Sequence, residues 1–180
     1  MSLQISETGI QDCRIEIQPL FGSKESGVLH ILSGGEKNKE WFGGPVNDVY
    51  ACFSTNNTAR GGHYHKVLDE MFITVSGTAL WIVSDFRPES PTYKKTAAVV
   101  TGWNKVETKH TFPSYTFEEL GGLARLRVPA GVYHAVYPLA KSGYLAVALG
   151  TTGHVAEDYA YPTLEEVPEM KGILQLFNFL

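Results

Sequence analysis

The sequence lacks the features that mark several whole classes of protein. It has no run of basic residues and its net charge is −4, so binding to nucleic acid or to an acidic membrane surface is not expected. No segment offers the roughly 20 continuous apolar residues that a membrane helix needs. The N-terminus lacks the basic and apolar regions of a signal peptide. We therefore expect a cytoplasmic protein with neither nucleic acid nor membrane as a partner.

Cysteine is scarce, and only Cys13 and Cys52 are present. Their spacing does not suggest a disulfide framework, and free cysteines are among the most often buried residues. We expect two reduced, partly buried thiols. The chain also has no low-complexity tract, internal repeat or linker-like stretch that would divide it. At 180 residues it is expected to form one domain around one core.

Helix signals are few, whereas short strands between turn residues recur along the chain. Eighteen glycines and nine prolines separate them. Leu126 and Val128 alternate with Arg125 and Arg127, a period of two that is typical of a half-exposed strand. Many short strands with turn signals predict an antiparallel sandwich or barrel. The segments expected to be strands are 14–19, 28–32, 48–54, 71–76, 79–84, 97–100, 125–128 and 144–149.

The one helix signal lies near the C-terminus. Thr163 and Glu166 have the spacing of a capping box after Pro162, and Pro168 limits the helix that they would start. Residues 170–180 form a short apolar tail. Because such a tail would promote aggregation if it were left in water, we expect it to pack on the barrel or on a second subunit. On this ground we expect a homodimer.

A cluster of histidines and one glutamate occupies the middle of the chain. Residues i and i+2 of a strand point to the same face, so an extended backbone would direct His63 and His65 the same way. Glu70 begins the next apolar run, and a turn can bring it beside them. A tight turn at 129–131 opens another strand and delivers His134. Three imidazoles and one carboxylate would suit a divalent transition metal such as Zn, Fe, Mn, Ni or Cu.

These residues resemble the two motifs of the cupin superfamily. The first motif, H-x-H, three or four residues, E, six residues and G, is matched by His63, His65, Glu70 and Gly77. The second motif, P-x-G-x-x-H, is matched by residues 129–134. A glycine ahead of the first motif and an asparagine after the second are replaced, but neither position supplies a metal ligand. Both motif cores are therefore present, in the expected order.

The resemblance implies an all-β fold, namely the cupin-type antiparallel β-barrel or jelly roll, with a short C-terminal helical tail. We expect a single cupin domain over residues 1–180. Within it, residues 1–47 would form N-terminal strands, residues 48–150 the barrel core and residues 151–180 the tail. The site would lie inside the barrel mouth.

The residues around the motifs resemble one branch of the superfamily more closely. Residues 60–64, RGGHY, resemble the R-G-x-H-y segment of the dTDP-4-dehydrorhamnose 3,5-epimerases. Residues 85–93 and 128–134 resemble that family's D-x-R…S-P-T-f and P-P-G-x-x-H segments. The H-x-H-K form at 63–66 is closer to the related dTDP-sugar 3,4-ketoisomerases. The resemblance implies an enzyme that acts on a nucleotide-linked keto sugar, in polysaccharide or deoxysugar biosynthesis.

The resemblance also implies roles for single residues. In the epimerases a base removes a proton next to the sugar carbonyl, and His63 matches that base. Its ordinary pKa of about 6.5 suits proton abstraction at neutral pH. Arg60 matches the arginine that holds nucleotide phosphate, for which a planar guanidinium is well shaped. His65 and His134 would lie beside the base, and Lys66 is a second candidate for binding the substrate.

Two residues of the epimerases are replaced in this chain. Glu70 stands where the family has a lysine that neutralises the enolate oxygen, and a carboxylate would repel that charge. Glu70 could instead pair with a nearby lysine or arginine: Lys66, Arg60 or Arg125. The family's acid, a tyrosine on the strand after the second motif, is also absent there. Tyr133, Tyr137 and Tyr144 lie nearby, and any of them could substitute if the geometry allows; Tyr133 is the one that we list as catalytic.

Two further functions stay open beside the epimerase or isomerase. One is a metal-dependent cupin enzyme on another small molecule, in which a cation could stabilise the enolate in place of lysine. Its ligands would be His63, His65, Glu70 and His134, and a metal-bound His63 could not also be the free base. The other is a non-catalytic cupin that binds a sugar.

The remaining polar candidates lie outside any motif. His30, His110 and His154 are expected to be structural or at the surface, because histidine is frequently part-buried without a functional role. Glu157 and Asp158 are expected to be solvated.

Overall fold

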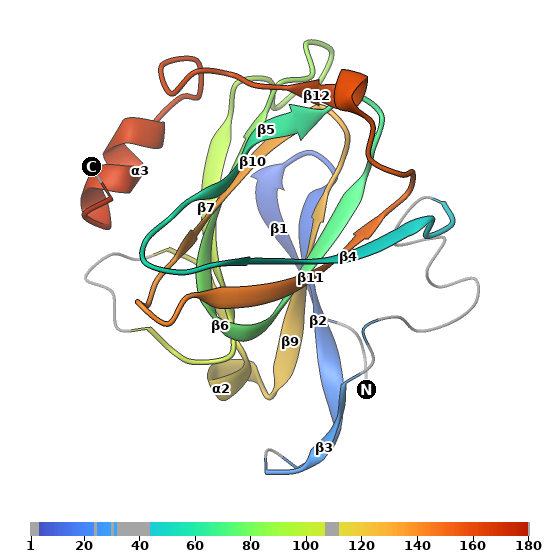
Figure 1. Ribbon diagram of the computed structural model, residues 1–180, viewed down its shortest axis with the longest axis vertical. Coiled ribbons are helices and arrows are strands. Elements are labelled where there is room, and N and C mark those ends of the chain that lie inside the picture. The colour runs from blue at the N-terminus through green and yellow to red at the C-terminus, as the bar shows by residue number, and fades with distance from the viewer. Residues whose placement is uncertain (1–3, 24, 30, 32–43, 107–111, 180) are drawn as a thin grey trace.

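The computed structural model describes residues 4–23, 25–29, 31, 44–106 and 112–179, and this part of the chain is built mainly of β-strands (Figure 1). The expectations for His30 and His110, and for the end of the strand predicted at 28–32, lie outside the described residues. Within the described part, no helix is long and apolar enough to cross a membrane. Cys13 is buried, Cys52 is half-buried, and both are free, as predicted.

The elements follow one another as short strands with few helices. The strands are β1 (Gln4–Ile10), β2 (Cys13–Gly22), β3 (Gly27–Leu29), β4 (Asp48–Ser54), β5 (Arg60–His65), β6 (Glu70–Asp85), β7 (Thr96–Gly102), β8 (Ser114–Thr116), β9 (Gly122–Val128), β10 (Val132–Pro138), β11 (Tyr144–Gly150) and β12 (Tyr159–Ala160). The helices are α2 (Phe117–Leu120) and α3 (Met170–Leu176), and η1 (Ala156–Asp158) is a 3-10 turn.

The long strand β6 belongs to two sheets, and Gly77 marks the change from one to the other. Its first half pairs with β9 and β11, and its second half, from Thr78, pairs with β7 and β10. Gly77 has a φ of 70°, and a Cβ added there would lie 2.1 Å from the Gly143 carbonyl oxygen. Only glycine fits such a close approach. The interruption predicted between 71–76 and 79–84 is therefore a bend within one strand.

The two sheets form the predicted all-β jelly roll. One sheet runs β1-β2-β9-β6-β11-β4 and the other runs β8-β7-β6-β10-β5-β12. Every pair is antiparallel except β7 with β8. Among the described strands, β4 and β12 each have a partner on one side, so hydrogen bonds do not close the barrel. Figure 1 shows the strands wrapped around a common interior.

The main core fills the space between the sheets and includes Trp81. Trp81 is 1% exposed. Its indole N–H donates a hydrogen bond of 2.9 Å to the Thr101 hydroxyl, which satisfies the one polar group of the ring. The ring of Phe72 lies 4.6 Å away, centroid to centroid. Burying a side chain such as Phe72 contributes about 1.5–3 kcal/mol.

The C-terminal tail packs on the outer face of the second sheet. Met170, Ile173 and Leu174 of α3 are buried in one apolar cluster with Leu80 and Ile82 of β6. Figure 1 shows α3 lying beside this side of the barrel. The tail therefore packs on its own barrel, one of the two predicted locations. The apolar tail consequently no longer argues for a homodimer, which stays a prediction.

The prediction that a helix starts at Thr163 is wrong. The backbone N–H and the hydroxyl of Thr163 do donate to the Glu166 carboxylate, at 2.7 and 2.9 Å. Residues 164–166 nevertheless form only a turn, and the helix begins at Met170. The reason is Pro168, since a proline excludes the residue before it from helical geometry.

The alternation predicted for β9 is correct, but the strand is not half-exposed. Arg125 is 3% exposed and forms an ion pair with Glu16 of β2, which is also 3% exposed. Leu126 points into the main core. The outer face of this sheet is covered as well, because Leu123 and Phe117 belong to a separate buried cluster there. Both faces of the strand are therefore buried.

Candidate active site

Two paired strands and one loop bring four histidines together. His63 and His65 lie on β5, and His134 of β10 stands opposite His63 in the register of that pair. The centroid of the His63 ring lies 4.7 Å from that of the His134 ring and 5.0 Å from that of the His65 ring. His154, in the loop after β11, lies 5.5 Å from His65. The predicted grouping of three histidines is thus present, with a fourth beside it.

The double glycine before His63 permits this close pairing. Gly61 has a φ of 77°, and a Cβ there would lie 2.7 Å from the carbonyl oxygen of His134. A side chain at this position would push β5 away from β10. The glycine in the RGGH segment therefore sets the distance between the two histidine-bearing strands.

Glu70, the first residue of β6, lies at the centre of the cluster and is 1% exposed. Its Oε2 is 3.4 Å from Nε2 of His65 and 3.3 Å from Nε2 of His134. Its Oε1 accepts a hydrogen bond from the Tyr50 hydroxyl and lies 3.6 Å from Nε2 of His154. Its partners are therefore imidazoles and a phenol rather than the lysine or arginines considered from the sequence.

This setting keeps Glu70 charged. Burial by itself would raise its pKa, but His134, His154, His65 and the Tyr50 hydroxyl lower the pKa to about 2. Glu70 is thus a carboxylate at neutral pH. A buried carboxylate is stable only where positive charge or N–H donors face it, so the surrounding imidazoles must supply protons or hold a cation.

Asp158 fixes the orientation of His65. Its Oδ2 lies 3.0 Å from Nδ1 of His65, and its Oδ1 accepts hydrogen bonds of 2.8 Å from the backbone N–H groups of Lys66 and Val67. The carboxylate on Nδ1 directs the opposite nitrogen, Nε2, at Glu70. Asp158 is 3% exposed, so the expectation that it is solvated is wrong. The reason is that η1 folds back onto the end of β5.

His154 is a second site residue, after Asp158, that the sequence analysis missed. Its Nδ1 lies 2.8 Å from Oδ2 of Asp48, and its ring meets the Tyr50 ring edge-on at 4.7 Å. The Glu70 carboxylate, and then Asp48, raise the pKa of His154 to about 9 against the effect of burial. It is therefore an imidazolium at neutral pH. No motif marks it, because its position depends on the register that places Gly150 opposite Asp48.

His63 is different, since among the described residues no carboxylate pairs with it. Its ring lies edge-on to Tyr159 at 4.8 Å and to Tyr161 at 5.7 Å. Burial, then the neighbouring His134 and His65, lower the pKa of His63 to about 3. His63 is thus neutral at neutral pH and has a lone pair free to accept a proton. It is a weaker base than an isolated histidine.

The cluster opens into a cavity of about 90 Å³. A water molecule occupies about 30 Å³ of liquid, so this space holds the reacting edge of a small molecule and not a whole nucleotide sugar. Arg60 is exposed and contributes to the wall. The full lining consists of Tyr50, Cys52, Arg60, Gly61, His63, Phe72, Trp81, His134, Val136, His154 and Tyr159.

Two predicted site residues lie outside this cavity. Tyr133 is next to His134 on β10 and therefore points to the opposite face, where it is 5% exposed in the apolar cluster beneath α3. Burial raises its pKa to about 12. Lys66 is exposed and donates to the Glu157 carbonyl oxygen at 2.7 Å. Tyr133 therefore faces away from the cavity in which its catalytic role was expected, and Lys66 is not part of the described cavity wall.

Residues 85–92, the D-x-R…S-P-T segment, form a loop next to the site that is held by side-chain hydrogen bonds. Asp85 is fully buried and accepts hydrogen bonds from Arg87, Ser90 and Thr92. The side chain of Arg87 packs on Gly131, where an added Cβ would lie 2.4 Å from its Cγ. The segment thus braces the turn before β10 and contributes no group to the cavity wall.

Some of these residues could hold a metal ion. Their ligand atoms form two groups, each within 4.8 Å, namely His63, His65 and His134, and His65, Glu70 and His154. The predicted set of four is thus divided between two groups that share His65. Within the described part of the chain, Nε2 of His65 and Oε2 of Glu70 are buried without a hydrogen-bond partner. A proton or a cation between them would resolve this, and imidazole with carboxylate suits a transition metal.

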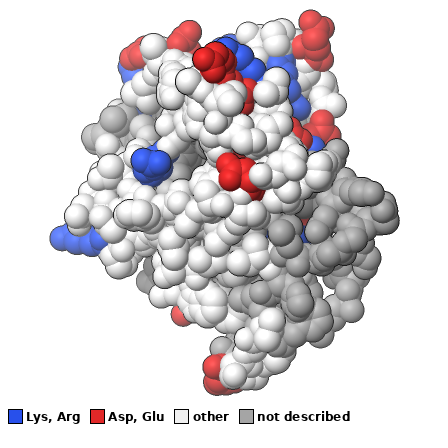
Figure 2. Space-filling model, turned by 45° about the vertical axis from the view of Figure 1, so that its right-hand side comes forward, with Lys and Arg blue, Asp and Glu red and all other residues white. Residues whose placement is uncertain are grey.

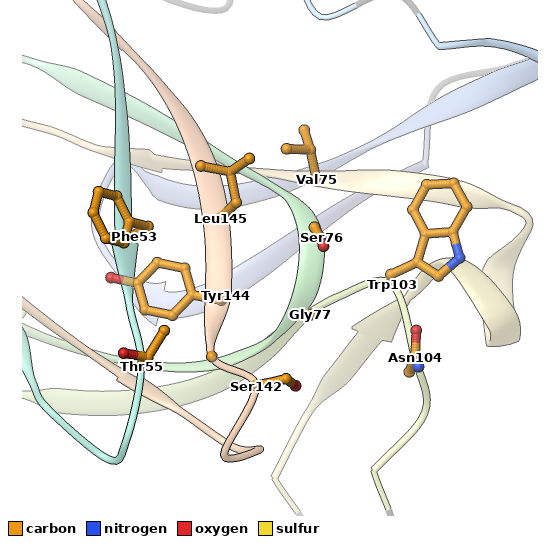
Figure 3. Close-up of a pocket in the computed structure, with 11 residues that line it drawn as sticks. Phe53, Thr55, Val75, Ser76, Gly77, Trp103, Asn104, Ser142, Tyr144 and Leu145 are labelled. Carbon is orange, nitrogen blue, oxygen red and sulfur yellow. The ribbon is translucent and has the colours of Figure 1, made fainter.

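A larger concavity of about 700 Å³ lies near Tyr144, toward the other end of the β4–β11 pair (Figure 3). Trp103 and Asn104 lie on one side of it, and Phe53 and Leu145 lie across from them. Among the described residues that line it there is no histidine, carboxylate, lysine or arginine. The described part of this lining therefore differs from the histidine cavity, where imidazoles lie in the wall.

Charge is distributed unevenly over the surface. On the face drawn in Figure 2, charged side chains of both signs gather toward the upper end of the molecule, where β12 lies in Figure 1. Over the rest of the described surface on this face they are sparse. No single-sign patch stands out there, in keeping with the small net charge of −4.

Comparison with known proteins identifies the fold. Neither a protein-family model nor a curated protein matches the sequence. Solved structures do, and one is the dTDP-4-dehydrorhamnose 3,5-epimerase from Sulfolobus tokodaii, with a TM-score of 0.71, 17% identity, and coverage of 93% of this chain and 85% of that chain. Another is the dTDP-4-dehydrorhamnose 3,5-epimerase from Bacillus anthracis with TDP and PPi bound. Its TM-score is 0.70 at 18% identity, and the match covers 93% of this chain and 89% of that chain.

A third similar structure is ChmJ, a 3′-monoepimerase from Streptomyces bikiniensis in complex with dTDP-quinovose. Its TM-score is 0.69 at 20% identity, and the match covers 90% of this chain and 74% of that chain. The protein therefore has the cupin-type jelly-roll fold. More specifically, it has the form of that fold found in the dTDP-4-dehydrorhamnose 3,5-epimerases, as the resemblance of its motifs predicted.

Proposed function

We propose that the protein is an epimerase or isomerase that acts on a nucleotide-linked keto sugar by removing a proton next to the carbonyl. One observation carries the proposal. A neutral imidazole, His63, lies in the wall of a small cavity together with the exposed guanidinium of Arg60. The first group can accept a proton and the second can hold a phosphate outside the cavity.

The base in this proposal is His63 rather than His65. Nε2 of His65 is buried and faces Glu70, and Nδ1 faces Asp158. Both nitrogens of His65 thus face carboxylates of the protein, and the described cavity wall does not include His65. His63 lines the cavity, and no carboxylate in the described part of the chain pairs with it. A positioned general base typically contributes a factor of about 10² to 10⁴ to the rate.

The nucleotide part of the substrate is supported by the rim of the cavity and by the similar structures. A cavity of about 90 Å³ leaves most of a nucleotide sugar outside, where Arg60 can make paired hydrogen bonds to phosphate. The structures of similar fold hold TDP with PPi, or dTDP-quinovose. We therefore propose a dTDP-linked sugar as the substrate class. A cytoplasmic location is a further part of this proposal, because both cysteines are free and thiols stay reduced in that compartment. A homodimer is also part of this proposal.

Solvent exchange tests the reaction directly. The protein is incubated in D₂O with dTDP-4-keto-L-rhamnose and a panel of related keto sugars, and deuterium next to the carbonyl is followed by NMR. We expect incorporation into at least one of them. Absence of deuterium in every sugar would refute the enolisation, and retained dTDP binding would then favour the non-catalytic sugar-binding cupin.

Nucleotide binding is tested separately by thermal unfolding with dTDP. A ligand at 100 times its Kd adds about 2.7 kcal/mol of stability, which is a rise of about 5–10 °C for a domain of this size. Arg60→Ala should reduce that rise, whereas Lys66→Ala should leave it unchanged. If both substitutions change the rise in melting temperature equally, Arg60 does not bind the nucleotide.

A metal-dependent cupin enzyme is the second candidate, and the two buried, unpartnered atoms on His65 and Glu70 favour it. A divalent transition metal held by His65 with Glu70, or by the three imidazoles of the first ligand group, would supply a Lewis acid for the substrate carbonyl. Elemental analysis of the purified protein should then find about one such metal per chain. Full activity of metal-free protein would exclude this candidate.

A further inference from the structure

The larger concavity, called the Trp103 groove from here on, is separate from the histidine cavity. Trp103 and Asn104 bound it on one side, and Phe53 and Leu145 bound it on the other (Figure 3). The described linings of the groove and of the histidine cavity share no residue. The groove lies at the Tyr144 end of β11, and six residues at about 3.4 Å each separate this end from Gly150, at the histidine end, by about 20 Å. Its volume of about 700 Å³ is in the range of small-molecule sites.

Trp103 gives the groove a fixed aromatic surface. Its ring stacks on the buried ring of Phe117, with the centroids 4.2 Å apart and the planes at 19°. Its backbone N–H donates to the Gly77 carbonyl oxygen at 2.8 Å, and its own carbonyl oxygen accepts from the Glu118 N–H at 3.1 Å. The Trp103 side chain is nevertheless 36% exposed. Because these contacts already hold the indole in place, it loses little freedom when a ligand packs on it.

Uncharged polar side chains surround this indole. Their hydroxyl and amide groups can donate and accept hydrogen bonds, yet within the described part of the chain they form none. Covering them with a purely apolar surface is unfavourable, because they would lose water without gaining a partner. The groove therefore suits a ligand that brings its own hydroxyl groups. The side chains concerned are those of Thr55, Ser76, Asn104 and Ser142.

The composition of the groove also selects the charge of its ligand. Among the described residues that line it there is no charged side chain, so a phosphate or carboxylate would leave water without gaining a countercharge. The opposite wall is apolar and open, with Phe53 67% and Leu145 39% exposed. Aromatic and apolar surface therefore stands beside uncharged hydrogen-bonding groups. A neutral sugar ring has the matching features, namely a C–H face and a rim of hydroxyl groups.

We propose that the Trp103 groove is a second binding site, whose ligand is a neutral saccharide. The C–H face of a sugar ring packs on the indole of Trp103, and the sugar hydroxyls bond to the side chains of Asn104 and Ser142. Phe53 and Leu145 contact the ring from the opposite wall. This site goes beyond the proposed function, because no step of the proton transfer uses it.

Titration of ¹⁵N-labelled protein with maltose, cellobiose and L-rhamnose, followed by NMR, tests the binding. We expect at least one of these saccharides to shift the amide signals of residues 103–104 and 142–145 and to leave those of β5 unchanged. Trp103→Ala should weaken this binding about tenfold, since it removes the aromatic surface. Asn104→Ala should weaken it about threefold to tenfold, since it removes one hydrogen-bonding group.

Two controls separate binding from folding. The Asn104 side chain has no hydrogen bond within the described part of the chain, so Asn104→Ala should unfold at the wild-type temperature and decides the test even if Trp103→Ala is unstable. Tyr93 is an aromatic residue, 47% exposed, that does not belong to the described lining of the groove. Tyr93→Ala should bind the saccharide as wild type does.

Three results would overturn the inference. The first is that no saccharide of the panel shifts the groove signals at millimolar concentration. The second is that the shifts appear on β5 or are reversed by dTDP, because the sugar would then bind in the histidine cavity. The third is a dimer that Phe53→Ala converts to monomer while neither form binds a saccharide, because a second copy would then cover the groove. Failure of the wild type to exchange any keto sugar would refute the proposed function alone.

Discussion

Replacing Asp158 by asparagine tests whether a carboxylate behind His65 organises the site. Three N–H groups converge on this carboxylate, those of the His65 ring and of the Lys66 and Val67 backbones. The asparagine oxygen can keep the two backbone bonds. Its amide nitrogen would then face Nδ1 of His65. Because both groups are hydrogen-bond donors, they could not bond to each other. The substitution therefore removes one charge-assisted hydrogen bond and changes the nitrogen of His65 that carries the proton.

The expected loss follows from that one bond. A buried hydrogen bond to a charged group contributes about 1.5–3 kcal/mol, which for a domain of this size is a fall in melting temperature of about 3–12 °C. We also expect kcat/KM to fall at least tenfold. Asp158 contacts His65, and His65 contacts Glu70, so these three residues together set the positions of the rings around His63. Thermal unfolding and steady-state kinetics measure the two effects.

The control is Glu157→Gln, since Glu157 is adjacent and exposed. It should shift the melting temperature by less than 1 °C and leave kcat/KM unchanged. The reasoning is refuted if Asp158→Asn behaves like this control. It is also refuted if Asp158→Asn loses stability as expected but retains full kcat/KM, because His65 would then have no influence on the base.

Three further predictions concern single residues. Tyr133→Phe should retain at least half of the wild-type kcat/KM, because its ring lies on the far face of β10; a 100-fold loss would return Tyr133 to the reaction. Since the pKa of His63 is lowered to about 3, kcat/KM at pH 5.5 should stay within twofold of its value at pH 7.5, whereas a base with a pKa of about 6.5 would lose about 90%. Although burial would raise the pKa of Asp85, hydrogen bonds from Arg87, Ser90 and Thr92 lower it. Its stabilisation is therefore present above the unfolded pKa of about 3.9 and lost as pH falls below that value. Chemical unfolding at pH 7 and pH 3 should show a smaller difference for Asp85→Asn than for wild type, and an equal difference would contradict the linkage.

Local pattern was sufficient to predict most of the strands, although not β1, β8 or β12. It was also sufficient to predict the grouping of His63, His65 and His134. The period of two fixes the face on which each side chain lies, and the glycine and proline turns fix where strands end. The same rule, applied to β10, would have placed Tyr133 on the opposite face from His134. That error came from reading distance along the chain as distance in space.

The rest of the site depends on contacts between distant segments. Asp158 and His154 follow the last long strand and carry no motif, yet the 3-10 turn and the β4–β11 register bring both beside Glu70. Long-range register of this kind is not encoded in any short window. The burial of Arg125 was missed for a related reason, since its partner Glu16 lies on β2.

Deuterium exchange by His63→Gln against wild type tests the central claim most directly. Both proteins are incubated in D₂O with the keto sugar that wild type exchanges, and dTDP binding confirms that each is folded. The account predicts rapid labelling of the carbon next to the carbonyl by wild type, and labelling at least 100 times slower by the variant. Labelling by the variant at the wild-type rate would contradict the assignment of the base to this cavity.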